Sequence, residues 1–220
     1  MIIFQLILNN MDFKTFIYLA NLLGIISFAL SGIFKGIKYN HDLFGVTLLA
    51  IITSVGGGVM RDVLLNKIPN ALINPQDIYV AVITTLVIYL PYLLFKPKFD
   101  DNVVKKARRL VLISDAVGLS LFVSIGANIA IQNSLNTIGV IIMATITAVG
   151  GGILRDILAN ETPFILKEDI YAILCVIAGF FYKIMIVDLQ LNEIRTTIII
   201  FFMVLIVRLI VIKKNLNLPK

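Results

Sequence analysis

Two charged pairs inside apolar segments are the residues of this sequence with the clearest capacity for chemistry. Arg61–Asp62 and Arg155–Asp156 each follow shortly after three consecutive glycines, in stretches that are otherwise apolar. Charged side chains within a membrane-spanning helix are costly and usually mark an ion or substrate pathway. The alternative is that they lie near the span ends and extend their long side chains to the membrane surface. Because both pairs accompany a glycine triplet, we favour the pathway interpretation.

The glycine triplets themselves suggest an interrupted helix. They are Gly56, Gly57 and Gly58 in the first stretch and Gly150, Gly151 and Gly152 in the second. Each glycine weakens a helix by about 1 kcal/mol relative to alanine. A kink or break there would free carbonyl groups, which lipid tolerates only where protein or a water-filled cavity satisfies them. Close helix packing through small residues is the alternative. We favour a break that lines a pathway, because packing usually needs only one glycine per turn.

The two stretches are copies of one motif. The pattern T-x-V-G-G-G-x-x-R-D-x-L begins at Thr53 and again at Thr147, 94 residues later. Each copy belongs to a set of three apolar spans, so the second set enters the membrane in the opposite orientation. Inverted repeats of this kind are typical of secondary transporters, whose sites lie at the repeat interface. Channels use the same architecture, so the repeat leaves channel and carrier open.

The repeat also suggests charge partners. Asp115, in the fourth span, corresponds to Asn21 in the first. We expect Asp115 to contact Arg155 in one membrane half, and Asn21 to contact Arg61 in the other. Neighbouring residues point about 100° apart on a helix, so each arginine is expected to pair poorly with the aspartate beside it. Asp115 would otherwise be a helix-start residue favoured by the helix dipole. Further polar candidates for the pathway are Asn21, Thr53, Ser54 and Thr147.

The composition excludes a soluble protein. Of 220 residues, 59% are apolar and 15% are charged, whereas soluble domains have about 45–50% apolar and about 25% charged residues. A water-soluble nucleic-acid binder is excluded too, despite the net charge of +6. The single cysteine, Cys175, excludes an internal disulfide, and the single histidine, His41, excludes a multi-histidine metal cluster. Without a phosphate loop, a metal-ligand set or a nucleophile–base arrangement, we expect neither an enzyme nor a cofactor.

The apolar segments predict an all-α integral membrane protein with seven spans. The spans are 16–34, 43–60 (running on to about 65), 78–95, 110–131, 138–154 (running on to about 159), 170–187 and 196–212. Residues 1–220 then form one membrane domain. Its parts are repeat one (about 15–95), a basic linker (96–109), repeat two (about 110–187) and an unpaired seventh helix (about 196–212).

The basic residues predict the orientation. Thirteen of them, Lys35 and Lys38 included, fall on one side of the membrane and four on the other, with Arg61 and Arg155 inside spans. The richer side is expected in the cytoplasm. The N-terminus would then be outside and the C-terminus inside. Arg208, near a span end, is expected to reach the membrane surface.

On the doubled G-G-G-x-x-R-D motif, the sequence resembles the prokaryotic branch of the trimeric intracellular cation channels, over almost the whole chain. The resemblance implies a homotrimer in a prokaryotic cell membrane, with lipids around it and no nucleic-acid partner. Each protomer would have its own pore for monovalent cations, chiefly potassium, with sodium as the other permeant ion. Bound lipid is the only other small molecule that the resemblance suggests.

The resemblance also implies which residues form the pore. The glycine-kinked second and fifth helices of the family correspond here to 43–65 and 138–159, with the Arg-Asp pairs beside the pathway. Animal members carry a Lys-Glu-Val motif and a basic tail that this sequence lacks, so their reticulum location is not expected. Related bacterial sequences have been labelled glycine transporters. A secondary carrier for glycine or another small solute therefore stays open as the alternative.

Overall fold

The computed structural model describes residues 12–95, 101–167 and 169–214. This part of the chain is helical. The helices are α2 (Phe13–Lys38), α3 (Leu43–Leu64), α4 (Asn70–Ile73), α5 (Gln76–Phe95), α6 (Asp101–Gln132), α7 (Thr137–Leu158), α8 (Phe164–Lys167), α9 (Asp169–Lys183) and α10 (Glu193–Lys214), and a π-helical turn, η1 (Ile184–Asp188), continues α9.

Seven of the described helices are long and apolar enough to cross a membrane, which confirms the predicted number of spans. They run alternately in opposite directions, so the bundle has two ends. We call the end at which α2 and α7 finish the Lys38 end, and the end at which α3 and α6 finish the Lys67 end. Helix α6 begins at Asp101, so most of the predicted linker is an extension of this helix. Residues 96–100 of that linker lie outside the described residues.

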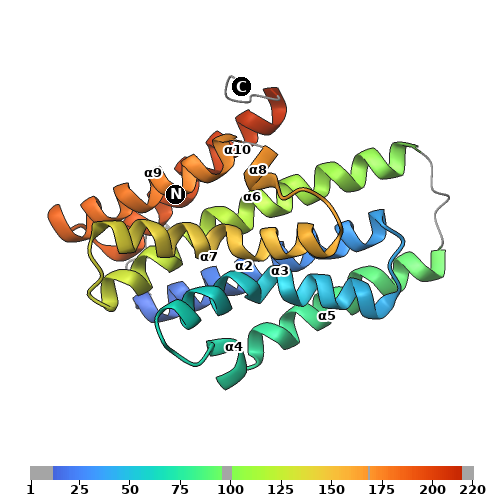
Figure 1. Cartoon of the computed structure of the whole chain (residues 1–220), viewed down its shortest axis with the longest axis horizontal. Helices are drawn as coiled ribbons and strands as arrows, with labels where there is room; N and C mark the ends of the chain where they lie inside the picture. Colours follow the sequence, from blue (N-terminus) through green and yellow to red (C-terminus); the bar gives the residue numbers. More distant parts are fainter. Residues whose placement is uncertain (1–11, 96–100, 168, 215–220) are drawn as a thin grey trace.

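Four helices form the centre of the molecule. Helices α2, α3, α6 and α7 pack against one another, with α5 on the side of α2 and α3, and α9 and α10 on the side of α6 and α7 (Figure 1). The rings of Phe28 and Phe122 stack at 5.1 Å where α2 meets α6. Glycine permits this approach, because a Cβ atom on Gly24 would meet the Phe122 ring at 2.9 Å.

Equivalent positions of the two repeats begin and end their helices in the same way. Asp42 and Asn136 each precede a helix, and their side-chain oxygens accept a hydrogen bond from the backbone N–H three residues on, at 2.7 and 2.9 Å. Such caps satisfy donors that a helix start leaves free. After the helices, Asn66 and Asn160 take φ values of 54° and 53°, a left-handed conformation that asparagine tolerates better than most residues.

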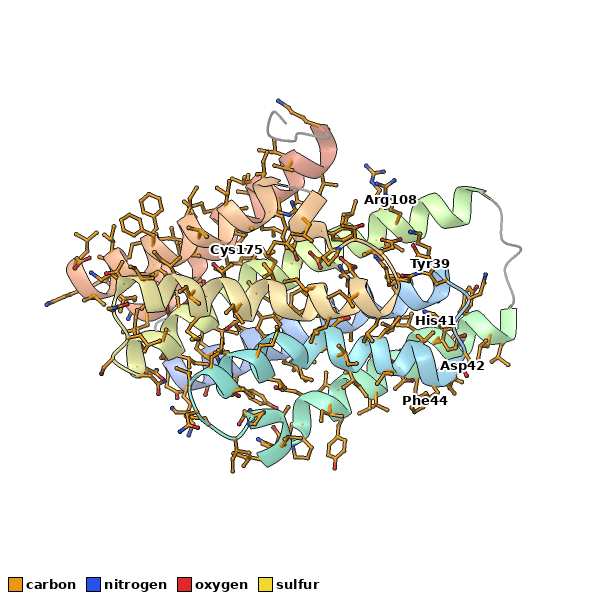
Figure 2. All side chains as sticks on the ribbon, viewed as in Figure 1. Tyr39, His41, Asp42, Phe44, Arg108 and Cys175 are labelled. Carbon is orange, nitrogen blue, oxygen red and sulfur yellow. The ribbon has the colours of Figure 1, made fainter. Side chains whose placement is uncertain are left out.

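The histidine and the cysteine lie in different surroundings. His41 is in the short turn between α2 and α3 at the Lys38 end, beside Tyr39 and Asp42 (Figure 2). Its backbone carbonyl accepts a hydrogen bond from the Tyr89 hydroxyl at 2.9 Å, which attaches this turn to α5. Cys175 is fully buried in α9 and is a free thiol.

Candidate functional site

The glycine triplets bring α3 and α7 into direct backbone contact. A Cβ atom on Gly57 would overlap the backbone carbonyl of Thr147, and one on Gly151 would overlap the backbone carbonyl of Thr53. The two contacts are equivalent in the repeat, so each helix presents the same surface to the other. Only glycine permits helix backbones to approach this closely.

Both helices continue without interruption through their triplets, so the predicted helix break is wrong for this conformation. The physical reason is the packing of α3 against α7. The neighbouring helix covers the glycines, and their backbone groups keep their hydrogen bonds within the helix. The polar candidates beside the triplets are engaged in the same way. The hydroxyls of Thr53 and Thr147 donate to carbonyls four residues back at 2.5 and 2.6 Å. The Ser54 hydroxyl is 2.8 Å from the Ala50 carbonyl of its own helix and 3.0 Å from the Ile25 carbonyl of α2.

The third glycine of each triplet faces an arginine instead of the neighbouring helix. A Cβ atom on Gly58 would meet Arg61 Nη2 at 3.7 Å. One on Gly152 would lie 3.3 Å from the Tyr171 hydroxyl and 3.4 Å from Asp115 Oδ1. These positions therefore leave room for charged and polar groups beside the helix contact.

Arg155 is the centre of a buried charge cluster near the Lys38 end. Its Nη1 donates to Asp115 Oδ1 at 2.8 Å and to the Ser31 hydroxyl, and its Nε donates to Asp156 Oδ1 at 2.9 Å. Arg155, Asp115 and Asp156 are all 0% exposed. The ring of Phe164 covers the guanidinium at 5.0 Å. The predicted contact between Asp115 and Arg155 is confirmed.

Each arginine also pairs with its sequence neighbour, contrary to expectation. Arg61 Nε donates to Asp62 Oδ1 at 2.8 Å, as Arg155 Nε does to Asp156. The prediction was wrong because it considered only the direction of the Cβ atoms. The long arginine side chain follows the helix surface and closes the angle between neighbours.

The second carboxylate oxygen of each aspartate holds a loop. Asp62 Oδ2 accepts from the backbone N–H of Asn70 at 2.9 Å, and Asp156 Oδ2 accepts from that of Phe164 at 3.0 Å. These N–H groups open the short helices α4 and α8. Each Arg-Asp pair therefore links a central membrane helix to the loop that follows it.

Sequence reasoning missed three members of the cluster, Lys35, Lys38 and Glu161. Lys35 is 1% exposed, and its ammonium lies 2.8 Å from Asp156 Oδ1 and 2.7 Å from Glu161 Oε2. Lys38 binds the other Glu161 oxygen at 2.5 Å. Charge counting from the sequence places both lysines on the cytoplasmic side of the membrane. The repeat contained a signal for them, because charge differs between equivalent positions. Glu161 stands where the first repeat has Lys67, and Lys35 stands where the second repeat has Ile129.

The lysines determine the charge state of Glu161, which lies in the loop between α7 and α8. Partial burial disfavours the ionised carboxyl, but hydrogen bonds and charges from Lys35 and Lys38 outweigh this effect and lower its pKa. Glu161 is therefore an ionised partner of both lysines at neutral pH.

The Lys67 end lacks the predicted contact between Asn21 and Arg61. Asn21 Nδ2 instead donates to Asp77 Oδ1, on α5, at 2.9 Å. Arg61 is already bound by Asp62, and Asn21 carries no charge to attract it. The expectation for Arg208 is also wrong, because this residue is 0% exposed and its guanidinium lies 4.7 Å over the ring of Tyr171.

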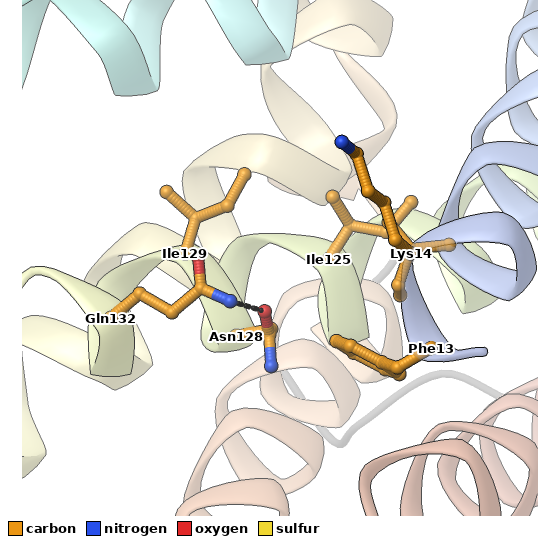
Figure 3. Close-up of a pocket in the computed structure, with 7 residues that line it drawn as sticks. Phe13, Lys14, Ile125, Asn128, Ile129 and Gln132 are labelled. Carbon is orange, nitrogen blue, oxygen red and sulfur yellow. Dashed lines mark hydrogen bonds between the residues drawn. The ribbon is translucent and has the colours of Figure 1, made fainter.

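An open groove of about 210 Å³ lies apart from the cluster, at the Lys67 end (Figure 3). Apolar side chains from the start of α2 and the last turns of α6 form most of its wall. Gln132 Nε2 donates to Asn128 Oδ1 at 2.8 Å within it. Lining residues are Phe13, Lys14, Ile17, Ile125, Asn128, Ile129 and Gln132. The groove and the Arg155 cluster are therefore separate features.

Comparison with known proteins gives consistent likenesses. A family model described as "Glycine transporter" matches residues 18–96 and 112–186. The UPF0126 inner membrane protein YadS of Escherichia coli K12 is 34% identical over 208 residues, covering 92% of this chain and 95% of that protein. The UPF0126 membrane protein YvgT of Bacillus subtilis is 33% identical over 163 residues, covering 73% and 76%.

Solved structures share the fold. One chain, from work on conductance through TRIC cation channels, is 35% identical with a TM-score of 0.77, covering 96% of this chain and 97% of its own. A prokaryotic TRIC channel crystallised in 0.5 M KCl is 33% identical with a TM-score of 0.79, covering 93% and 100%. The TRIC orthologue from Rhodobacter sphaeroides is 27% identical with a TM-score of 0.80, covering 92% and 100%.

The solved relatives are described as cation channels and the Escherichia coli relative as an inner membrane protein, which agrees with the non-enzymatic, multi-pass membrane protein predicted from the sequence. The likeness extends over nearly the whole chain in both directions. The chain therefore belongs to the prokaryotic TRIC family, and it also matches the glycine-transporter family model and the UPF0126 membrane proteins.

Proposed function

We propose that the chain is a passive channel for monovalent cations, chiefly potassium, with one pathway in each protomer of a homotrimer. The observation that carries this proposal is the fully buried charge cluster of Asp115, Arg155 and Asp156 between membrane spans. Ionised groups at such depth are functional by default, because apolar residues would fill the same space without the cost of desolvation. The solved relatives named as cation channels support the same class of function.

In this proposal the pathway runs beside the glycine contact of α3 and α7, along the faces that carry Gly58 and Gly152. Oxygen atoms on these faces replace the water that a potassium ion gives up. The Asp115 carboxylate lies beside Gly152, and its Oδ2 is buried without a hydrogen-bond partner among the described residues, so it is available as a ligand. Asp115 and Asp156 neutralise Arg155, which would otherwise repel a cation.

The proposal places the Lys38 end in the cytoplasm, with the N-terminus outside. This orientation follows from the excess of lysine and arginine at that end. The bundle carries many exposed apolar side chains, such as Leu94 at 81% and Ile68 at 69% exposure, which membrane lipid or neighbouring protomers would cover.

A carrier for glycine or another small zwitterion is the second candidate. The description of the family model favours it. Arg155 Nη2 and Asp115 Oδ2, both without a hydrogen-bond partner among the described residues, would match a carboxylate and an ammonium group.

Reconstitution of the full chain into planar bilayers with a potassium gradient separates the two candidates. A channel gives unitary current steps whose reversal potential follows the potassium gradient. A carrier gives saturable glycine uptake with counterflow in vesicles and no unitary steps. The second result would overturn the channel proposal.

A further inference from the structure

The ammonium group of Lys35 occupies a position that has the properties of a cation site. It lies 2.8 Å from Asp156 Oδ1 and 2.7 Å from Glu161 Oε2, and the ring of Phe164 faces it at 5.0 Å. An ammonium carries the same single charge as potassium and is of similar size. We propose that these oxygens form a binding site for a permeating monovalent cation and that Lys35 competes for it as a tethered cation. The inference rests on the proposed channel function.

Each carboxylate of the site keeps a hydrogen-bonding partner when Lys35 leaves. Asp156 keeps Arg155 at 2.9 Å and the backbone N–H of Phe164 at 3.0 Å, and Glu161 keeps Lys38 at 2.5 Å. No buried carboxylate is therefore left without a partner, which is the usual cause of large destabilisation. Removal of the lysine adds one negative charge to the site, which attracts a free cation.

Lys35 lies close to one end of the bundle. It lies three residues before Lys38, in the last turn of α2, where the helix reaches the Lys38 end. A lysine has a flexible four-carbon stem and a strongly hydrated head group, so it can extend to a membrane surface within reach. The Lys38 side chain, one turn further on, is already 25% exposed.

The repeat shows that the fold itself does not require this lysine. Position 35 corresponds to Ile129, and Glu161 corresponds to Lys67. Asp62, the equivalent of Asp156, is bound by Arg61 and by the backbone N–H of Asn70. Of the two equivalent sites, the competing lysine is therefore present only at the one at the Lys38 end. In this inference, the cation concentration at the Lys38 end determines how often a free cation displaces the lysine.

Flux measurements on the full chain in liposomes test the inference. With low potassium at the Lys38 end, Lys35→Met should raise the initial rate of potassium flux by at least about fivefold, within the usual range of coupling between competing states. Lys35→Arg keeps the charge and should leave the rate low. Lys67→Met, which changes a lysine of the equivalent loop at the other end, is the matched control and should leave the rate unchanged.

A binding readout gives an independent check. Potassium should raise the melting temperature of Lys35→Met more than that of the wild type, because ligands that bind only the folded state stabilise it. If Lys35→Met fails to assemble, Lys35→Gln removes the same charge, keeps a group that can donate to these oxygens, and should raise the flux instead. If the wild type conducts potassium and Lys35→Met leaves that flux unchanged or abolishes it, the inference is overturned but the channel proposal is not. Absence of flux from the wild type and from Lys35→Met overturns both.

Discussion

Replacing Arg155 with glutamine should destabilise the protein more than replacing Asp115 with asparagine. Arg155 binds Asp115 at 2.8 Å and Asp156 at 2.9 Å, so its loss leaves Asp115 without its cation and removes one of the two cations that bind Asp156. Breaking a buried pair in this way costs about 3–5 kcal/mol. Asp115→Asn leaves Arg155 bound to Asp156 and keeps an acceptor, so we expect a loss of about 2 kcal/mol, typical of one hydrogen bond to a charged group.

The double variant should be more stable than the sum of the single effects indicates. Asparagine and glutamine are both neutral, so neither ionised partner of the Asp115–Arg155 pair is stranded. We expect the free energy of unfolding of the double variant to fall by about 4 kcal/mol, whereas the sum of the single effects is about 6 kcal/mol. The difference is a coupling energy of about 2 kcal/mol, which is within the range for residues in contact.

Denaturant unfolding in lipid–detergent micelles, followed by circular dichroism, measures these free energies. The repeat supplies the control, because Asn21 and Arg61 are the equivalent residues and bind Asp77 and Asp62 instead of each other. Asn21→Ala and Arg61→Gln should add within about 0.5 kcal/mol. Additive effects at Asp115 and Arg155, or equal coupling in both cycles, would refute the reasoning.

Three further tests probe the helix contact, the orientation and the loop charge. Gly57→Ala should lower the melting temperature, since overpacking costs about 1–3 kcal/mol. In contrast, the new Cβ of Gly58→Ala meets Arg61 Nη2 at an ordinary van der Waals distance of 3.7 Å, so this change should stabilise by up to about 1 kcal/mol through helix propensity. In intact cells, a cysteine within 96–109 should be protected from impermeant thiol reagents added outside, and one within 66–77 should react; the reverse pattern contradicts the orientation. The ionised Glu161 stabilises the fold above the ordinary glutamate pKa of about 4.3, and this contribution is lost as pH falls through its lowered folded-state pKa. The melting temperature should therefore fall more steeply below about pH 4.3 in the wild type than in Glu161→Gln, and parallel curves would contradict this role.

The sequence predicts the spans well because lipid imposes a simple requirement of length and apolarity. The repeat also predicts a side-chain contact, because it places Asp115 and Arg155 in the same half of the membrane. The structure shows the two residues in contact. What the pattern does not contain is the length and flexibility of side chains. Arg61 reaches its neighbour Asp62 for that reason, although a helical projection separates them.

Lys35 and the glycine triplets show the second limit. A lysine near the end of an apolar span is counted as a surface residue, and only the position of the α7–α8 loop reveals that Lys35 is buried. A run of glycines is compatible with a broken helix and with a close helix contact. The neighbouring backbone decides between them, and in this structure Gly57 lies against the Thr147 carbonyl.

The exchange of contacts between Gly57–Thr147 and Gly151–Thr53 has a consequence for how such a chain arises. An interface in which each surface meets its own copy is isologous, the arrangement of a two-fold symmetric dimer. Two separate half-length proteins, inserted in opposite directions, would make the same contact. Joining them in one polypeptide fixes their ratio and their opposite insertion. It also frees each half to change alone, and the halves differ at the equivalent positions Asn21 and Asp115.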